Sequence, residues 1–73
     1  MDYRKHIEIS PEVRFGKPCI IGTRIAVFDV LSWLAEGLSF EEILRDFPTL
    51  TKENILATLA YSADKERKIQ VSL

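Results

Sequence analysis

Cysteine and histidine are scarce in this sequence, with Cys19 and His6 the single examples of each among 73 residues. One cysteine excludes an intrachain disulfide, and the two residues together form no cluster with metal-ligand spacing. We therefore expect no metal and no cofactor, and we expect Cys19, which has apolar neighbours, to pack as a small hydrophobe. A core of this size supplies only about 3–5 kcal/mol without such supports. We therefore expect a homodimer or a partner protein to stabilise it.

Long apolar runs are missing as well. The longest is residues 25–28, whereas a transmembrane helix needs about 20 apolar residues. Residues 1–15 contain cations but no apolar stretch behind them, so the pattern of a signal peptide is not present. These features predict a cytoplasmic protein that does not associate with a membrane.

A strong charge of one sign is also lacking, because the formal net charge is −1. Residues 1–26 carry five cations and three acids, and residues 27–73 carry five cations and eight acids. A protein that binds nucleic acid through its overall charge is more basic than this. Any contact with DNA phosphate is therefore expected to be local.

Catalytic constellations are equally absent from the sequence. No serine has a histidine placed to activate it, and the neighbouring Glu41 and Glu42 would point to different sides of a helix. We therefore predict a protein that is not an enzyme and has no small-molecule substrate.

The patterns that are present predict short strands followed by three helices. Alternation indicates strands at 7–9, 19–21 and 25–27. Helical spacing from Val27 to Leu34 indicates a first helix that Gly37 ends, with Leu38 as its apolar lid.

Two capping signals place the other helices. Ser39 and Glu42 form a capping box, so a second helix should run from there to about Asp46, before Pro48. Thr51 then caps a third helix to about Lys68.

The expected fold is therefore mainly α, a small α+β domain spanning 1–73. It comprises strands and turns (1–26), a three-helix, homeodomain-like helix-turn-helix core (27–68) and a tail (69–73). The tail alternates at period two, which leaves open a last strand, a frayed end or a segment that orders on a partner.

The stretch GKPCIIGTR at 16–24 raises the question of a phosphate-binding loop. A Walker loop places lysine and a hydroxyl side by side after its second glycine, whereas here Lys17 follows the first glycine and Thr23 follows Gly22 directly. A structural turn is the better interpretation, with Gly16 and Gly22 at positive φ and Pro18 fixing a bend. Arg24 could contact DNA phosphate or pair with an acid across a dimer, and the sequence does not separate the two.

The second and third helices have the spacing of a helix-turn-helix unit. Helical projection of the third helix predicts that Ile55, Leu56, Leu59 and Ala63 face inward. The opposite stripe would then read bases and hold phosphate, or would be an ordinary solvated face. The predicted DNA-binding residues are Asn54, Thr58, Tyr61, Lys65, Lys52 and Arg24, with Ala57 and Lys68 on the same stripe. Few cations lie there, so useful affinity would need a symmetric dimer.

Residues 6–68 resemble a small prokaryotic domain-of-unknown-function family with a GKP…GTR…GLS-EEI…DFP pattern. The matching positions are Gly16, Lys17, Pro18, Gly22, Thr23, Arg24, Gly37, Ser39, Glu42, Ile43 and Pro48. The resemblance implies a homeodomain-like helix-turn-helix and no catalytic residues. It also implies an antitoxin of a type II toxin–antitoxin pair, which would neutralise a PIN-like ribonuclease encoded beside it and bind operator DNA to regulate its operon.

Two alternatives remain open at this point. One is a protein-interaction adaptor without a DNA role, using Phe28, Trp33 and Tyr61 as contact anchors. The other is a stand-alone small transcriptional regulator with no toxin partner.

Overall fold

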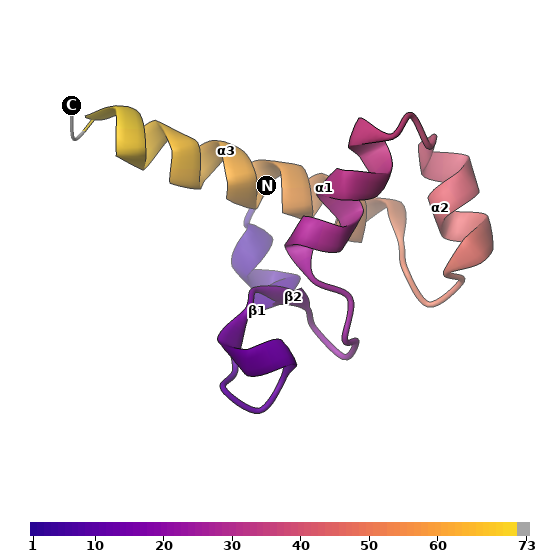
Figure 1. Ribbon diagram of the computed structural model, residues 1–73, viewed down its shortest axis with the longest axis horizontal. Coiled ribbons are helices and arrows are strands. Elements are labelled where there is room, and N and C mark those ends of the chain that lie inside the picture. Colours follow the sequence, from indigo (N-terminus) through magenta and orange to yellow (C-terminus); the bar gives the residue numbers. More distant parts are fainter. Residues whose placement is uncertain (72–73) are drawn as a thin grey trace.

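The computed structural model describes residues 1–71, and the side chains as far as Arg67. It is a small α+β fold in which a short antiparallel sheet precedes three helices (Figure 1). The elements in chain order are η1 (Tyr3–Lys5), β1 (Ile7–Glu8), η2 (Arg14–Gly16), β2 (Cys19–Ile20), α1 (Val27–Ala35), α2 (Phe40–Asp46) and α3 (Lys52–Val71), where η denotes a 3-10 helix.

The two strands pair within one chain, with Ile7 opposite Ile20 and Glu8 opposite Cys19. The strand expected at 25–27 is reduced to a single bridge between Cys19 and Ala26, because Val27 already begins α1. Cys19 is fully buried and Ile20 is 1% exposed, so this short sheet forms one wall of the core.

The predicted turn between β2 and α1 is confirmed. Gly22 has φ +80°, and the Thr23 hydroxyl donates to the Ile20 carbonyl at 2.8 Å while it accepts from the Ile25 amide at 3.0 Å. The Thr23 side chain therefore closes the turn from both sides, and the GTR part of the motif has a structural role.

The predicted helix boundaries are confirmed by their hydrogen bonds. The Leu38 amide donates to the Trp33 carbonyl and the Gly37 amide to the Leu34 carbonyl, which is the Schellman pattern, with Gly37 at φ +96°. Before α2, Ser39 and Glu42 exchange hydrogen bonds of 2.9 and 3.1 Å. A capping box of this kind stabilises a helix start by about 1 kcal/mol.

Helix α3 crosses the whole domain, and its second half extends beyond the rest of the chain (Figure 1). It contacts α1 and α2 as well as the N-terminal elements η1 and β1. The centre of the core is formed by side chains that are at most 1% exposed, among them Ile20, Val30, Ile43 and Ile55.

The predicted orientation of α3 is wrong for most of its length. Leu56 and Leu59 are 38% and 39% exposed, and Ala63 is exposed too, although all three were expected to face inward. Ala57 and Thr58, expected to face outward, are 0% exposed. The N-terminal elements η1 and β1, far away in sequence, pack on α3 together with α1, so hydropathy along the helix alone does not decide which side is buried.

The end of the chain also differs from one expectation. Residues 69–71 continue α3 as helix, so they form no strand, and Ser72 and Leu73 lie outside the described residues. Within 1–71, none of the helices combines the length and the hydropathy that a bilayer span requires.

Candidate binding surfaces

Thr58, predicted to contact DNA, is sealed inside the domain. Its side chain is 0% exposed, and its hydroxyl donates to the Ile55 carbonyl of the same helix at 2.7 Å. That bond satisfies the buried hydroxyl without a ligand. The placement of Thr58 on a groove-reading face is therefore wrong.

Asn54 serves the architecture of the fold. Its Oδ1 accepts from the Thr51 amide at 2.9 Å, while the Thr51 hydroxyl accepts from the Asn54 amide at 3.1 Å. Its Nδ2 lies 3.2 Å from Nδ1 of His6, next to strand β1. Both ends of the half-buried amide are thus used to fix the start of α3 against the N-terminal segment.

Tyr61 is half-buried and packs edge-on against Tyr3, with ring centroids 5.4 Å apart. Nζ of Lys65 lies 5.3 Å from the centroid of the Tyr61 ring, within the range of a cation–π contact. Lys52, Lys65 and Arg24 are exposed, as DNA-binding residues must be. Lys52 and Lys65 line different hollows of the surface, so the described pockets do not bring these two cations together.

An ion pair that the sequence analysis did not predict fixes the start of α1. Nη1 of Arg14 lies 2.9 Å from Oδ2 of Asp29 and also donates to the Arg24 carbonyl at 2.8 Å. Asp29 in turn accepts from the Ala26 amide at 3.0 Å. Partial burial opposes ionisation of Asp29, but the hydrogen bonds from the Ala26 amide and the Arg14 guanidinium outweigh it. They hold the pKa of the carboxyl below its usual value. The sequence signal for the role of Asp29 was its position, three residues after Ala26 in the first turn of the predicted helix.

The ion pair holds a strained loop. Arg14 and Phe15 have φ of 51° and 59°, a left-handed conformation that residues other than glycine rarely adopt. The Phe15 side chain at the tip of this loop is 96% exposed. Its exposure makes it a useful comparison for other surface aromatics.

An apolar groove of about 530 Å³ lies between the start of α1 and the middle of α3. Most of its lining is apolar or aromatic, and three charged side chains also line it. Phe28 is 69% exposed there, although it is a large aromatic side chain. The Lys17-Pro18 pair of the GKP motif also lines the groove. The main lining residues are Pro18, Val27, Phe28, Leu31 and Tyr61, with Lys17, Lys65 and Glu66 as the charged members.

Trp33, one of three predicted contact anchors, is half-buried and packs against the core. Its ring stacks on Phe47 with a centroid separation of 4.4 Å and an interplanar angle of 11°. Tyr61 packs on Tyr3 but still lines the groove. Phe28 is therefore the anchor that the fold leaves available, and the sequence signal for it was its position off the Val27–Leu34 stripe.

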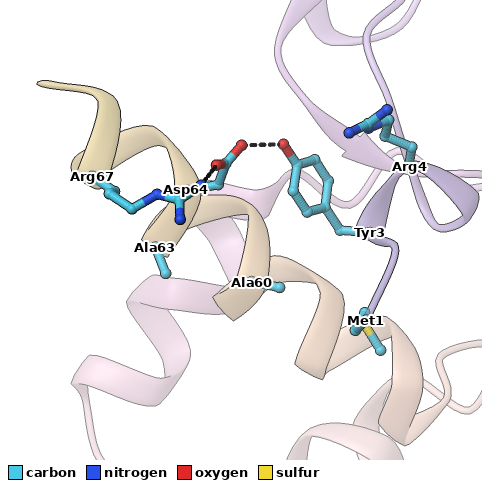
Figure 2. A pocket seen from close by; sticks show the side chains of 7 residues that line it. All are labelled: Met1, Tyr3, Arg4, Ala60, Ala63, Asp64 and Arg67. Carbon is cyan, nitrogen blue, oxygen red and sulfur yellow. Dashed lines mark hydrogen bonds and ion pairs between the residues drawn. The ribbon is translucent and has the colours of Figure 1, made fainter. Parts of the chain in front are cut away.

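A second hollow, of about 410 Å³, lies between the N-terminus and the outer side of α3. Figure 2 shows Ala60 and Ala63 between Met1 and Arg67, with the Tyr3 hydroxyl donating to Oδ2 of Asp64. The Arg67 guanidinium donates to Oδ1 of Asp64 at 3.1 Å. Two small side chains thus line this hollow, together with the charged residues Arg4, Asp64 and Arg67.

Groups that could support metal or thiol chemistry are not assembled in the described part of the chain. Residues 1–71 contain no cluster of three or more His, Cys, Asp or Glu residues placed to hold a metal ion. Burial raises the pKa of the Cys19 thiol, and a protonated thiol is a poor nucleophile.

Comparison with known proteins places this fold. A family model described as "Protein of unknown function (DUF433)" matches residues 7–62. The crystal structure of a DUF433 member protein from Anabaena variabilis ATCC 29413 is similar, with a TM-score of 0.78 and 30% identity, covering 90% of this chain and 65% of that one. The uncharacterized protein y4eO of Sinorhizobium fredii (strain NBRC 101917 / NGR234) is 36% identical over 59 residues, which are 81% of this chain and 27% of that protein. The family match covers most of the sequence, and the chain therefore belongs to the DUF433 family.

Proposed function

We propose that this DUF433 protein is a cytoplasmic, non-enzymatic antitoxin of a type II toxin–antitoxin pair, and that it holds its toxin at the groove between α1 and α3. The observation that supports a protein-binding role is Phe28, which is 69% exposed beside an apolar groove. The choice of a PIN-like ribonuclease as the partner rests on the family resemblance, because such proteins are commonly encoded beside relatives of this type.

The groove has the composition of a contact site for a protein. Aromatic side chains at the centre of an interface carry a large part of binding free energy, and Phe28 is already ordered on the first turn of α1. Lys17 and Lys65 outnumber Glu66 among the charged residues of the groove. An apolar segment that carries a carboxylate would therefore complement it.

Operator DNA is a second candidate ligand. Its support is the succession of a seven-residue α2, the turn at 47–51 and the long α3, which has the proportions of a helix-turn-helix unit. Of the predicted residues, Lys52, Lys65 and Arg24 are exposed and could contact phosphate. If the protein regulates its own operon, we expect these cations to act. A salt-dependent shift of the promoter DNA that Lys52→Ala weakens would support this role, and no shift at low salt would exclude it.

Co-expression with the neighbouring PIN-like protein tests the main proposal. We expect a stable complex whose Kd rises about 30-fold in Phe28→Ala, which corresponds to the roughly 2 kcal/mol of a hot-spot residue. Phe15→Ala is the matched control, because it removes the same side chain from an even more exposed position. Equal affinity of wild type and Phe28→Ala, or loss of binding only in Phe15→Ala, would contradict the proposal.

A further inference from the structure

The outer side of α3 carries a partly exposed apolar stripe, and Met1 and Tyr3 line the hollow over its alanine end. It contains the half-exposed Leu56 and Leu59, and Ala60 and Ala63 lie on the same side of the helix. The opposite side of α3, with Ala57 and Thr58, is the one that packs on the domain. A second helix along the stripe would therefore lie on the side away from the core and would meet the N-terminal residues that line this hollow.

The spacing along this stripe is that of a helix–helix seam. Lys52, Leu56, Leu59, Ala63 and Glu66 follow one another at alternating intervals of four and three residues. All five are exposed. This alternation is the pattern with which α-helices pack side by side in coiled coils. The seam has leucine towards one end and alanine towards the other.

The charges beside this seam would pair with those of a second copy that runs in the opposite direction. Glu53, Ala60 and Arg67 are spaced seven residues apart, so they share one side of the helix at intervals of about 10 Å. A two-fold axis near Ala60 would place Glu53 opposite Arg67 of a second copy, twice. The Arg67 side chain is 75% exposed although it pairs with Asp64, so its remaining N–H groups can donate.

The shapes along the stripe match in the same antiparallel arrangement. Leu56 of one copy would face Ala63 of the other, so that a large side chain meets a small one at both ends of the contact. The hollow of about 410 Å³ over Ala60 and Ala63 gives room for such a leucine (Figure 2). Large-to-small pairing of this kind is what close helix packing requires.

From these relationships we infer that α3 is a self-association surface, on which a second copy of this chain binds antiparallel about a two-fold axis near Ala60. The partner is a second copy because one face of α3 carries both positive and negative side chains. Their order places opposite charges together when a second copy runs antiparallel. DNA would call for one sign only. Of the seam residues, Glu66 also lines the Phe28 groove, whereas the leucines and alanines of the seam do not, and the inference does not rest on the proposed function.

Sedimentation of the full chain over a range of concentrations tests this inference. We expect a concentration-dependent dimer that Leu56→Glu weakens more than tenfold. Ile9→Glu is the matched control, since it places the same charge at another exposed aliphatic position and should leave the dimer unchanged. Circular dichroism establishes that each variant is folded. A wild-type chain that stays monomeric, or a dimer unaffected by Leu56→Glu, would overturn the inference.

Charge reversal gives a test that a merely structural effect cannot imitate. In Glu53→Arg alone, the introduced arginine would face Arg67 of the second copy, and in Arg67→Glu alone two glutamates would meet. Each variant should therefore dimerise about tenfold more weakly. An equimolar mixture of the two variants restores both ion pairs, and we expect it to form heterodimers of wild-type affinity. A mixture no tighter than its components would show that these residues do not meet.

Cross-linking locates the two-fold axis. Ala60→Cys places two thiols together at the axis, so mild oxidation should convert most of the chain to a disulfide-linked dimer. Ala35→Cys, at the exposed end of α1, is the control and should not form such a dimer. Cys19 is fully buried and does not interfere. Faster cross-linking through Ala35→Cys would contradict the antiparallel α3 interface. If the chain is monomeric and the α3 variants instead abolish binding of a different protein, the surface belongs to that protein and the inference is wrong.

Discussion

The Nδ2 group of Asn54 lies 3.2 Å from Nδ1 of His6, although 48 residues separate them in the chain. This contact joins the start of α3 to the end of the N-terminal 3-10 helix η1, which His6 caps. It occupies a side chain that would otherwise be suited to reading an adenine. The side chain of Asn54, predicted to contact DNA, is here turned towards the N-terminal segment of its own chain.

Asn54→Ala should destabilise the protein by about 1–2 kcal/mol, because it removes both the reciprocal cap with Thr51 and the contact with His6. Urea denaturation of the full chain measures this change. A double-mutant cycle with His6→Ala should give a coupling of about 0.5–1 kcal/mol. Strict additivity of the two variants would show that the contact contributes nothing.

Substitution of neighbouring residues tests the orientation of α3. Thr58→Lys puts a charge at a position that is 0% exposed and should cost more than about 3 kcal/mol, or prevent folding. Leu59→Lys is the adjacent control, and at 39% exposure it should cost less than about 1 kcal/mol in the monomer. Thermal unfolding followed by circular dichroism separates them. The reverse order of stabilities would restore the orientation predicted from the sequence.

Stability should fall in acid partly through Asp29. Since its pKa in the folded protein is lowered, the contribution of this carboxylate is complete above its unfolded pKa and is lost as the pH falls through the folded value. Asp29→Asn should cost about 1–2 kcal/mol at neutral pH and reduce the loss of stability below about pH 4. Asp46→Asn, which changes an exposed side chain, serves as the control. Denaturant titrations from acid to neutral pH measure both, and parallel profiles for Asp29→Asn and wild type would contradict the role of the ion pair.

Gly37→Ala should destabilise the protein by about 1 kcal/mol through the backbone alone. Gly37 has φ +96°, and nothing lies within 4 Å of the place that a Cβ would occupy. The cost therefore comes from the conformation and not from a clash. Glu36→Ala, one residue earlier with ordinary helical φ and ψ, should be nearly neutral. Equal stabilities of these two variants in urea would show that the helix ends in another way.

The local features of the fold could be predicted from the sequence because each depends on residues close together in the chain. The Ser39–Glu42 box, the Thr51 cap and the Gly37 helix end all need only side chains within four residues and the backbone between them. The GTR turn is of the same kind, since Thr23 bonds only to its neighbours.

The orientation of α3 could not be predicted in this way. Hydropathy favours the burial of Leu56 and Leu59 over that of Ala57 and Thr58, yet the latter two are buried. What decides the orientation is that β1 and η1, far away in sequence, contact the same helix. Periodicity within α3 carries no information about contacts with such distant elements.

The candidate site was predictable in part. Phe28 stands off the apolar stripe of α1, and it was one of the three aromatic residues named from the sequence as contact anchors. Its groove could not be foreseen, because the groove combines the GKP loop, α1 and α3. Trp33 carried the same signal but stacks on Phe47, since α1 has α2 and the turn after it on that side.

The most direct measurement of the central claim is site-specific photo-cross-linking in cells that co-express the chain with the proposed PIN-like partner. A photoreactive phenylalanine analogue at position 28 should cross-link to that protein, whereas the same analogue at the exposed position 15 should not. Cross-links from position 15 alone, or a stable complex that position 28 never reaches, would contradict the account.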